Sequence, residues 1–136
     1  MSYAGDLSPT EAYDVVRDNR DAVLVDVRTT AEWEQIGIPD LSGIGKEVVL
    51  LQWQQYPDGS INPNFAQELA EAVTPGAPVL MICRSGVRSV AAANAATAAG
   101  IAPAYNVTEG FEGGVDASGR RGSSGWRAAG LPWRQQ

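Results

Sequence analysis

One stretch, residues 78–100, constrains the fold more than any other part of the chain. An apolar run ends in Cys83, a polar loop follows, and an alanine-rich run leads to Gly100. This order predicts a buried strand over 78–83, a loop, and a helix over 87–99 closed by a C′ glycine. Such strand–loop–helix units build parallel α/β sheets, in which ligands bind at the carboxyl ends of the strands. We therefore expect the functional site beside Cys83.

The loop after Cys83 is predicted to bind an anion. Loop amides and the N-terminus of a helix present partial positive charge, and the same field favours a thiolate over a thiol. Arg84 and Arg88 fall inside this loop, in a chain with only ten basic residues. A lone cysteine is also a common small core residue. The loop, more than the cysteine itself, therefore makes Cys83 a candidate nucleophile.

Composition argues against several classes of function. The chain has 136 residues, enough for one domain with a real core, and a formal net charge of −6 with Lys46 as its one lysine. So acidic a chain is not expected to bind nucleic acid or anionic membranes. One cysteine and no histidine argue against an internal disulfide, a zinc site and a Cys–His pair. We expect no metal and no cofactor.

Targeting signals are not evident in the sequence. No apolar run approaches the roughly 18 residues that suggest a membrane helix. The N-terminal residues lack the basic and then apolar pattern of a signal peptide. A cytoplasmic location is therefore the expectation.

The other segments alternate between helix and strand patterns. Capping boxes at Ser8–Glu11 and Thr29–Glu32 predict helices that run to about Asn19 and Gln35. Apolar and amphipathic runs predict strands over 22–27, 48–51 and 104–107, and a helix over 65–73. Residues 37–45 are predicted as loop.

The C-terminal residues, 113–136, are rich in glycine but contain Trp126, Leu131 and Trp133. These side chains are too apolar for a free tail. We expect an ordered loop and one short helix over 126–129, docked on the domain. Trp53, after the predicted strand 48–51, is interpreted either as a core aromatic or as a wall of the site.

Charged residues lie near the carboxyl end of the strand 22–27. Asp26 interrupts this strand, and a buried aspartate needs hydrogen-bond donors or a cation. Asp26 is interpreted either as an acceptor of hydrogen bonds from loop amides or as a direct contributor to the site. Arg28 and Glu32 are close enough in sequence to form a local ion pair. We assign all three side chains a supporting role.

The ordered set of motifs resembles the rhodanese family. The matching residues run in family order over about 8–112 and comprise Leu24-Val25-Asp26-Val27-Arg28, Glu32-Trp33, Ile38-Pro39, Cys83-Arg84-Ser85-Gly86-Val87-Arg88-Ser89, Tyr105-Asn106-Val107 and Gly110-Phe111. Residues 113–136 resemble, more loosely, the C-terminal extension of some bacterial single-domain members. The resemblance implies a single α/β domain, with a mostly parallel sheet of about five strands flanked by helices on both faces.

The resemblance also implies a sulfurtransferase. Cys83 would take a sulfane sulfur from a small-molecule donor such as thiosulfate and carry it as a persulfide to cyanide or a thiol. The loop residues would bind the substrate, with their amides around the terminal sulfur: Arg84, Ser85, Gly86, Val87, Arg88 and Ser89. Arg84 and Arg88 would attract the anionic donor.

One departure and two alternatives accompany this resemblance. Gly37 stands where the family often has a histidine. A cysteine phosphatase or arsenate reductase would have a C-x5-R loop, whereas Arg88 lies five positions after Cys83 and the spacing is C-x4-R. The shorter loop suits one sulfur atom better than phosphate. A persulfide carrier that delivers sulfur to a partner protein remains compatible with every residue above.

Overall fold

The structure is a computed structural model and describes residues 2–136. A five-stranded sheet, in which every neighbouring pair is parallel, has the order β1-β6-β5-β2-β4. Its strands are β1 (Gly5–Leu7), β2 (Val23–Asp26), β4 (Val49–Leu50), β5 (Val79–Ile82) and β6 (Ala104–Val107). The strand that leads to Cys83 is central, as predicted.

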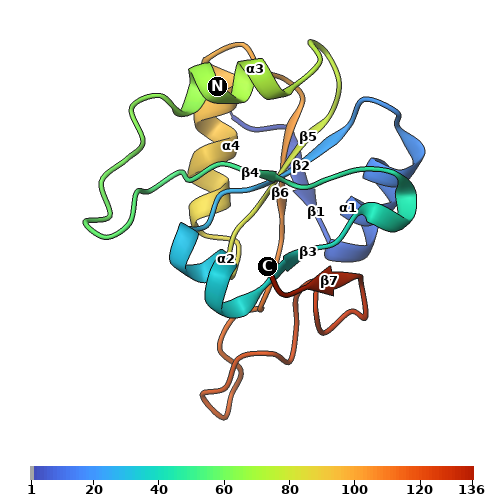
Figure 1. Cartoon of the computed structure of the whole chain (residues 1–136), viewed down its shortest axis with the longest axis vertical. Helices are drawn as coiled ribbons and strands as arrows, with labels where there is room; N and C mark the ends of the chain where they lie inside the picture. The colour runs from blue at the N-terminus through green and yellow to red at the C-terminus, as the bar shows by residue number, and fades with distance from the viewer. Residues whose placement is uncertain (1) are drawn as a thin grey trace.

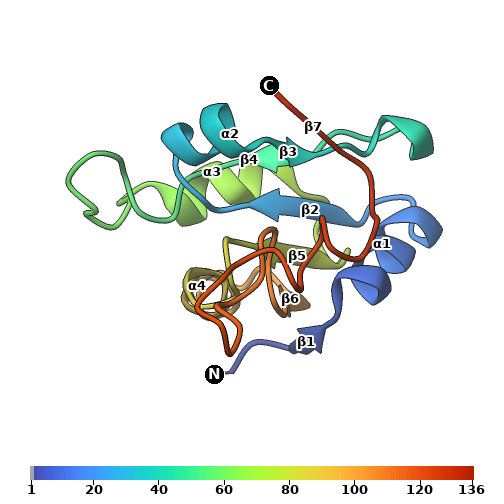
Figure 2. The ribbon, with the colours of Figure 1, turned by 90° about the horizontal axis from the view of Figure 1, so that it is seen from below.

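Helices cover both faces of this sheet (Figures 1 and 2). They are α1 (Pro9–Asp18), α2 (Thr30–Ile36), α3 (Phe65–Ala72) and α4 (Arg88–Ala98). α3 and α4 lie on one side and α1 on the other. Both predicted capping boxes are present, at Ser8–Glu11 and Thr29–Glu32. No helix within residues 2–136 is long and apolar enough to cross a membrane.

The central strand β5 is apolar because both of its faces are covered. Val79 and Met81 belong to the core under α3 and α4, whereas Leu80 and Ile82 belong to the core under α1. All four side chains are fully buried or nearly so, as is usual for a strand inside a parallel sheet. This packing fixes the position at which the chain leaves the sheet at Cys83.

The amino-terminal strand β1 was not expected from the sequence. It pairs with β6 in parallel, with Asp6 opposite Asn106. Its Gly-Asp-Leu sequence has neither an apolar run nor an alternating pattern long enough to indicate a strand. The strand lies just before the core that was predicted over about 8–112.

The C-terminal segment is ordered and docked, but the helix predicted over 126–129 was wrong. Residues 126–130 form hydrogen-bonded turns. The backbone N–H groups of Trp126 and Arg127 donate to the carbonyls of Gly110 and Phe111, which ties this segment to the loop after β6. Trp126 itself is fully buried, as expected.

A second, two-stranded sheet was also missed. β7 (Trp133–Arg134) pairs antiparallel with β3 (Ile38–Pro39), inside the segment predicted as loop. Two-residue strands have no periodicity that a sequence pattern can reveal. This pairing brings the end of the chain over the turn that follows α2 (Figure 2).

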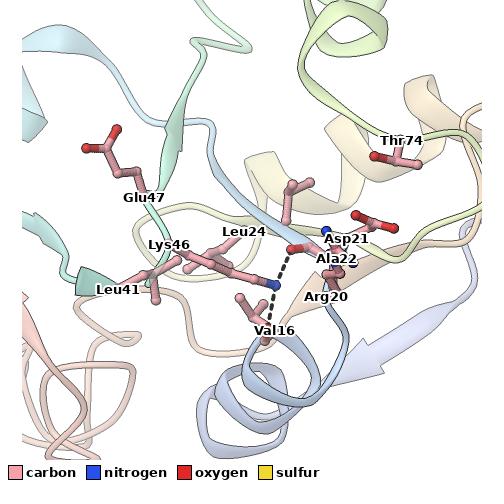
Figure 3. Close-up of a pocket in the computed structure, with 10 residues that line it drawn as sticks. Val16, Arg20, Asp21, Ala22, Leu24, Leu41, Lys46, Glu47 and Thr74 are labelled. Atoms are coloured by element: carbon pink, nitrogen blue, oxygen red, sulfur yellow. Dashed lines mark hydrogen bonds between the residues drawn. The ribbon is translucent and has the colours of Figure 1, made fainter. Parts of the chain in front are cut away.

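The one lysine closes the C-terminus of α1. Lys46 Nζ donates to the carbonyl oxygens of Val16, Asn19 and Ala22 at 2.6 to 2.8 Å, and burial lowers its pKa. The adjoining pocket of about 230 Å³ lies at the amino end of β2 (Figure 3). Because the strands are parallel, this is the end of the sheet opposite to Cys83.

Candidate active site at Cys83

Cys83 follows β5 directly and is 1% exposed. Its sulfur accepts a hydrogen bond from the backbone N–H of Gly86 at 3.1 Å, and the Ser89 hydroxyl lies 3.2 Å from it. Gly86 has φ of +100°, a conformation that side chains disfavour. The glycine therefore allows the loop to fold back so that its amide points at sulfur.

The N-terminus of α4 lies beside this loop. Val87 occupies the N-cap position, and no side chain caps the helix there. The first N–H groups of a helix lack partners within the helix and favour an anion. Of the other predicted loop residues, Arg84 and Val87 are exposed, Ser85 and Arg88 are half-buried and Ser89 is fully buried.

The segment after β6 anchors the cysteine loop. The N–H groups of Phe111 and Glu112 donate to the carbonyls of Cys83 and Arg84 at 2.8 and 3.0 Å. Gly110 has φ of +61°, and a Cβ at this position would overlap the carbonyl of Cys83. The backbone of the loop and the backbone of this segment are thus in direct contact.

Glu32 pairs with Arg88, so the predicted Arg28–Glu32 pair was wrong. The two terminal guanidinium nitrogens of Arg88, Nη1 and Nη2, donate to the two carboxylate oxygens of Glu32 at 2.6 and 2.9 Å. Burial raises the pKa of Glu32, but the hydrogen bonds and charge of Arg88, the Thr29 N–H and the charge of Arg28 together hold that pKa below its usual value. The same pair raises the pKa of Arg88. It ties α2 to the start of α4.

Arg84 also has a carboxylate partner. Its Nε lies 3.1 Å from Glu112 Oε2, while Arg127 lies 3.9 Å from the other oxygen. Glu112 is buried, whereas the Arg84 side chain is 44% exposed. Both loop arginines are therefore held by acidic groups, which offset part of the positive charge expected to attract an anionic donor.

Asp26 and Arg28 form a fully buried ion pair. Arg28 Nη2 lies 2.7 Å from Asp26 Oδ2, and both side chains are 0% exposed. Asp26 also accepts from the Arg28 backbone N–H at 3.1 Å. The guanidinium donates to the Gly37 carbonyl and lies over the ring of Phe111. The pair thus connects β2, the turn after α2 and the segment after β6.

Trp133 occupies the space beside Gly37. A Cβ on Gly37 would come within 3.0 Å of the Trp133 ring and 2.8 Å of the Arg134 carbonyl. Trp133 also meets Phe111 edge to face at 6.1 Å. The C-terminal strand therefore leaves no room for a side chain at this position. Trp53 instead packs against Phe65 beside α3.

Sequence reasoning missed two residues near the site, Asn106 and Asp6. Asn106 on β6 accepts from Ser89 Oγ at 2.5 Å and donates to Asp6 on β1 at 3.0 Å. A polar Asn inside an apolar strand was the available signal, because a buried amide needs partners. The site as a whole is a buried cysteine whose sulfur accepts the Gly86 N–H beside the uncapped N-terminus of α4. Such an arrangement can hold a nucleophilic sulfur anion.

Comparisons with known proteins identify chains of similar sequence and fold. The family model described as the STR4 middle domain matches residues 4–136. The crystal structure of Rv0390 from M. tuberculosis has 56% sequence identity and a TM-score of 0.92, covering 99% of this chain and 100% of that one. An uncharacterized protein of Rickettsia conorii is 40% identical over 125 residues, which are 92% of this chain and 93% of the relative.

Two further relatives carry descriptive names. The chloroplastic rhodanese-like domain-containing protein 4 of Arabidopsis thaliana is 28% identical over 93% of this chain and 25% of its own length. The polysulfide-sulfur transferase homodimer of Wolinella succinogenes is 26% identical, with a TM-score of 0.64, covering 96% of this chain and 78% of that chain. The chain therefore belongs to the rhodanese family, in the group that the STR4 middle-domain model describes.

Proposed function

We propose that this protein is a sulfurtransferase that carries sulfur as a persulfide on Cys83. Its rhodanese-like relatives support sulfur transfer or a related activity in general. One observation carries the finer proposal: the Cys83 sulfur lies under the uncapped N-terminus of α4 and accepts the Gly86 N–H at 3.1 Å. A persulfide is an anion, and preorganised donors of this kind stabilise it.

The reaction proceeds in two displacements. The Cys83 thiolate attacks the outer sulfur of thiosulfate, the S–S bond of the donor breaks, and sulfite leaves with the electron pair. The persulfide remains on Cys83, where the amides of residues 84–89 surround the terminal sulfur. Cyanide or a thiolate then attacks that sulfur, and Cys83 leaves as the thiolate. No metal or cofactor takes part in either displacement.

The loop arginines act in this proposal as positioning groups. Arg88 is fixed by Glu32 with two hydrogen bonds, so its charge stays close to the start of α4. Arg84 is more exposed and has a single close contact with Glu112, so it is better able to turn toward a donor. A protein thiol is an alternative acceptor, which would make the chain a persulfide carrier.

Turnover separates these possibilities. We expect wild-type protein to convert thiosulfate and cyanide into thiocyanate and sulfite, and Cys83→Ser to lose this activity while keeping the wild-type melting temperature. Ser118→Ala, a change in the exposed loop after Asp116, is the control and should retain full activity. Persulfide formation without cyanide turnover would indicate a carrier. Hydrolysis of an aryl phosphate by Cys83 would contradict the sulfur assignment.

A further inference from the structure

A chain of hydrogen bonds leads from Cys83 to the edge of the sheet. Cys83 Sγ lies 3.2 Å from Ser89 Oγ, which lies 2.5 Å from Asn106 Oδ1. Asn106 Nδ2 in turn donates to Asp6 Oδ1 at 3.0 Å. Cys83, Ser89 and Asn106 are each at most 3% exposed, whereas Asp6 is at the surface. Water therefore has little access to the inner part of this chain.

Asp6 determines the direction of each bond. An ionised carboxylate only accepts hydrogen bonds, so the amide nitrogen of Asn106 faces Asp6 and its carbonyl oxygen faces Ser89. The Ser89 hydroxyl has a single hydrogen, which it donates to Asn106. Ser89 can then meet Cys83 only as an acceptor. This arrangement suits a thiol, which donates its S–H, and does not suit a thiolate.

We propose that Asn106, oriented by Asp6, is a positioning residue that directs the Ser89 hydroxyl hydrogen away from the Cys83 sulfur and thereby opposes formation of the thiolate. Ionisation releases the S–H proton to solvent, and the Ser89 hydrogen then rotates from Asn106 to sulfur. The rotation leaves the buried Asn106 carbonyl without a donor, which opposes thiolate formation. This inference rests on the proposed role of Cys83 as the nucleophile.

Other charged and titratable groups lie on the loop of Cys83 and on the elements beside it. They are Arg84 and Arg88 on its loop, Asp26 and Arg28 at β2, Glu32 on α2, Glu109 and Glu112 after β6, and Tyr3 and Asp6 at β1. Among the side chains of residues 2–136, only Cys83 and Asn106 lie within hydrogen-bond distance of Ser89. A change at Asn106 thus alters the hydroxyl without removing any of these charges.

The test is the pH midpoint of Cys83 alkylation by iodoacetamide in the full-length chain. Cys83 is the one cysteine, so the signal belongs to it. Asn106→Leu removes the acceptor of Ser89, and we expect the midpoint to fall by about one pH unit, which is about tenfold more thiolate below the midpoint. A less polar neighbour by itself shifts the midpoint upward, so a fall identifies the release of Ser89.

A milder variant protects the test against misfolding. Asp6→Asn places at the surface a side chain that can also donate, which lets the Asn106 amide turn over and frees the Ser89 hydrogen. The midpoint should fall, by less than in Asn106→Leu. Tyr3→Phe removes only the hydroxyl that donates to Asp6 at 2.9 Å and should leave the midpoint unchanged.

The same substitutions in a Ser89→Ala background test whether Asn106 acts through the Ser89 hydroxyl. If Asn106 acts through Ser89, Asn106→Leu no longer lowers the midpoint once the hydroxyl is gone. Asp6→Asn then lowers the midpoint only by the amount that follows from the lost negative charge of Asp6. Equal shifts with and without Ser89, or no shift in a folded Asn106→Leu protein, would overturn the proposal. Sulfur loading is measured in parallel. A thiol that titrates as stated but takes no sulfur contradicts the proposed function alone.

Discussion

The buried Asp26–Arg28 pair offers the sharpest test of how the site is held. Asp26→Asn keeps the size of the side chain but removes the charge that faces a guanidinium of 0% exposure. Breaking a buried pair by removing one partner costs about 3–5 kcal/mol. Arg28 keeps the Gly37 carbonyl and the Phe111 ring, so we expect the lower value, about 3 kcal/mol.

Urea unfolding, followed by the fluorescence of the four tryptophans, measures this cost. With a slope of about 2 kcal/mol per molar urea, the midpoint should fall by about 1.5 M while the slope stays unchanged. Asp18→Asn breaks the exposed contact of Asp18 with Arg17 and is the matched control, with little expected effect. The double variant Asp26→Leu/Arg28→Met removes both charges and should recover most of the stability. A loss in Asp26→Asn no larger than in the control would refute the reasoning.

Three further predictions concern the loop. The pKa of Glu32 is lowered in the folded protein, so its pair with Arg88 stabilises the fold fully above about pH 4.3 and is lost as the pH falls through the folded-state pKa. The free energy of unfolding should therefore decrease less steeply with acid in Glu32→Gln than in the wild type. The same pH dependence in both proteins would contradict the pairing. Gly110→Ala should displace the loop and abolish sulfur loading, whereas Gly119→Ala, also at positive φ but with open space, should not; equal loading would show that the contact is dispensable. Arg88→Ala should move the midpoint of thiol alkylation to higher pH because a cation is lost, and adding Glu32→Gln should partly reverse the shift; an unchanged midpoint in Arg88→Ala would leave the amides as the only activators.

The sequence predicted what depends on local patterns. The strands that lead to Asp26 and Cys83, both capping boxes and the helix after the cysteine loop follow from periodicity and from turn chemistry within a few residues. The Cys83 loop was located for the same reason, since a strand, a glycine turn and a helix in succession determine where the cysteine lies. These features are the ones that the structure reproduces.

Contacts between residues far apart in the sequence were not predictable in the same way. Arg28 pairs with Asp26 because the chain bends after β2, where the Arg28 backbone N–H also donates to the Asp26 carboxylate. Glu32 is instead turned toward Arg88, 56 positions away. The pairing of β3 with β7 and the docking of Asn106 on Ser89 likewise join segments far apart in the chain. Their partners are set by the packing of the whole domain, which a local pattern does not contain.

The most direct test of the account is the intact mass of the protein after incubation with thiosulfate. We predict that the mass of the wild-type chain increases by one sulfur atom, that cyanide removes the increment, and that Cys83→Ser gains none. Peptide mapping should place the added sulfur on Cys83. An unchanged mass with thiosulfate and with a small-molecule persulfide donor, in protein whose Cys83 is still alkylated by iodoacetamide, would contradict the central claim that this cysteine carries sulfur.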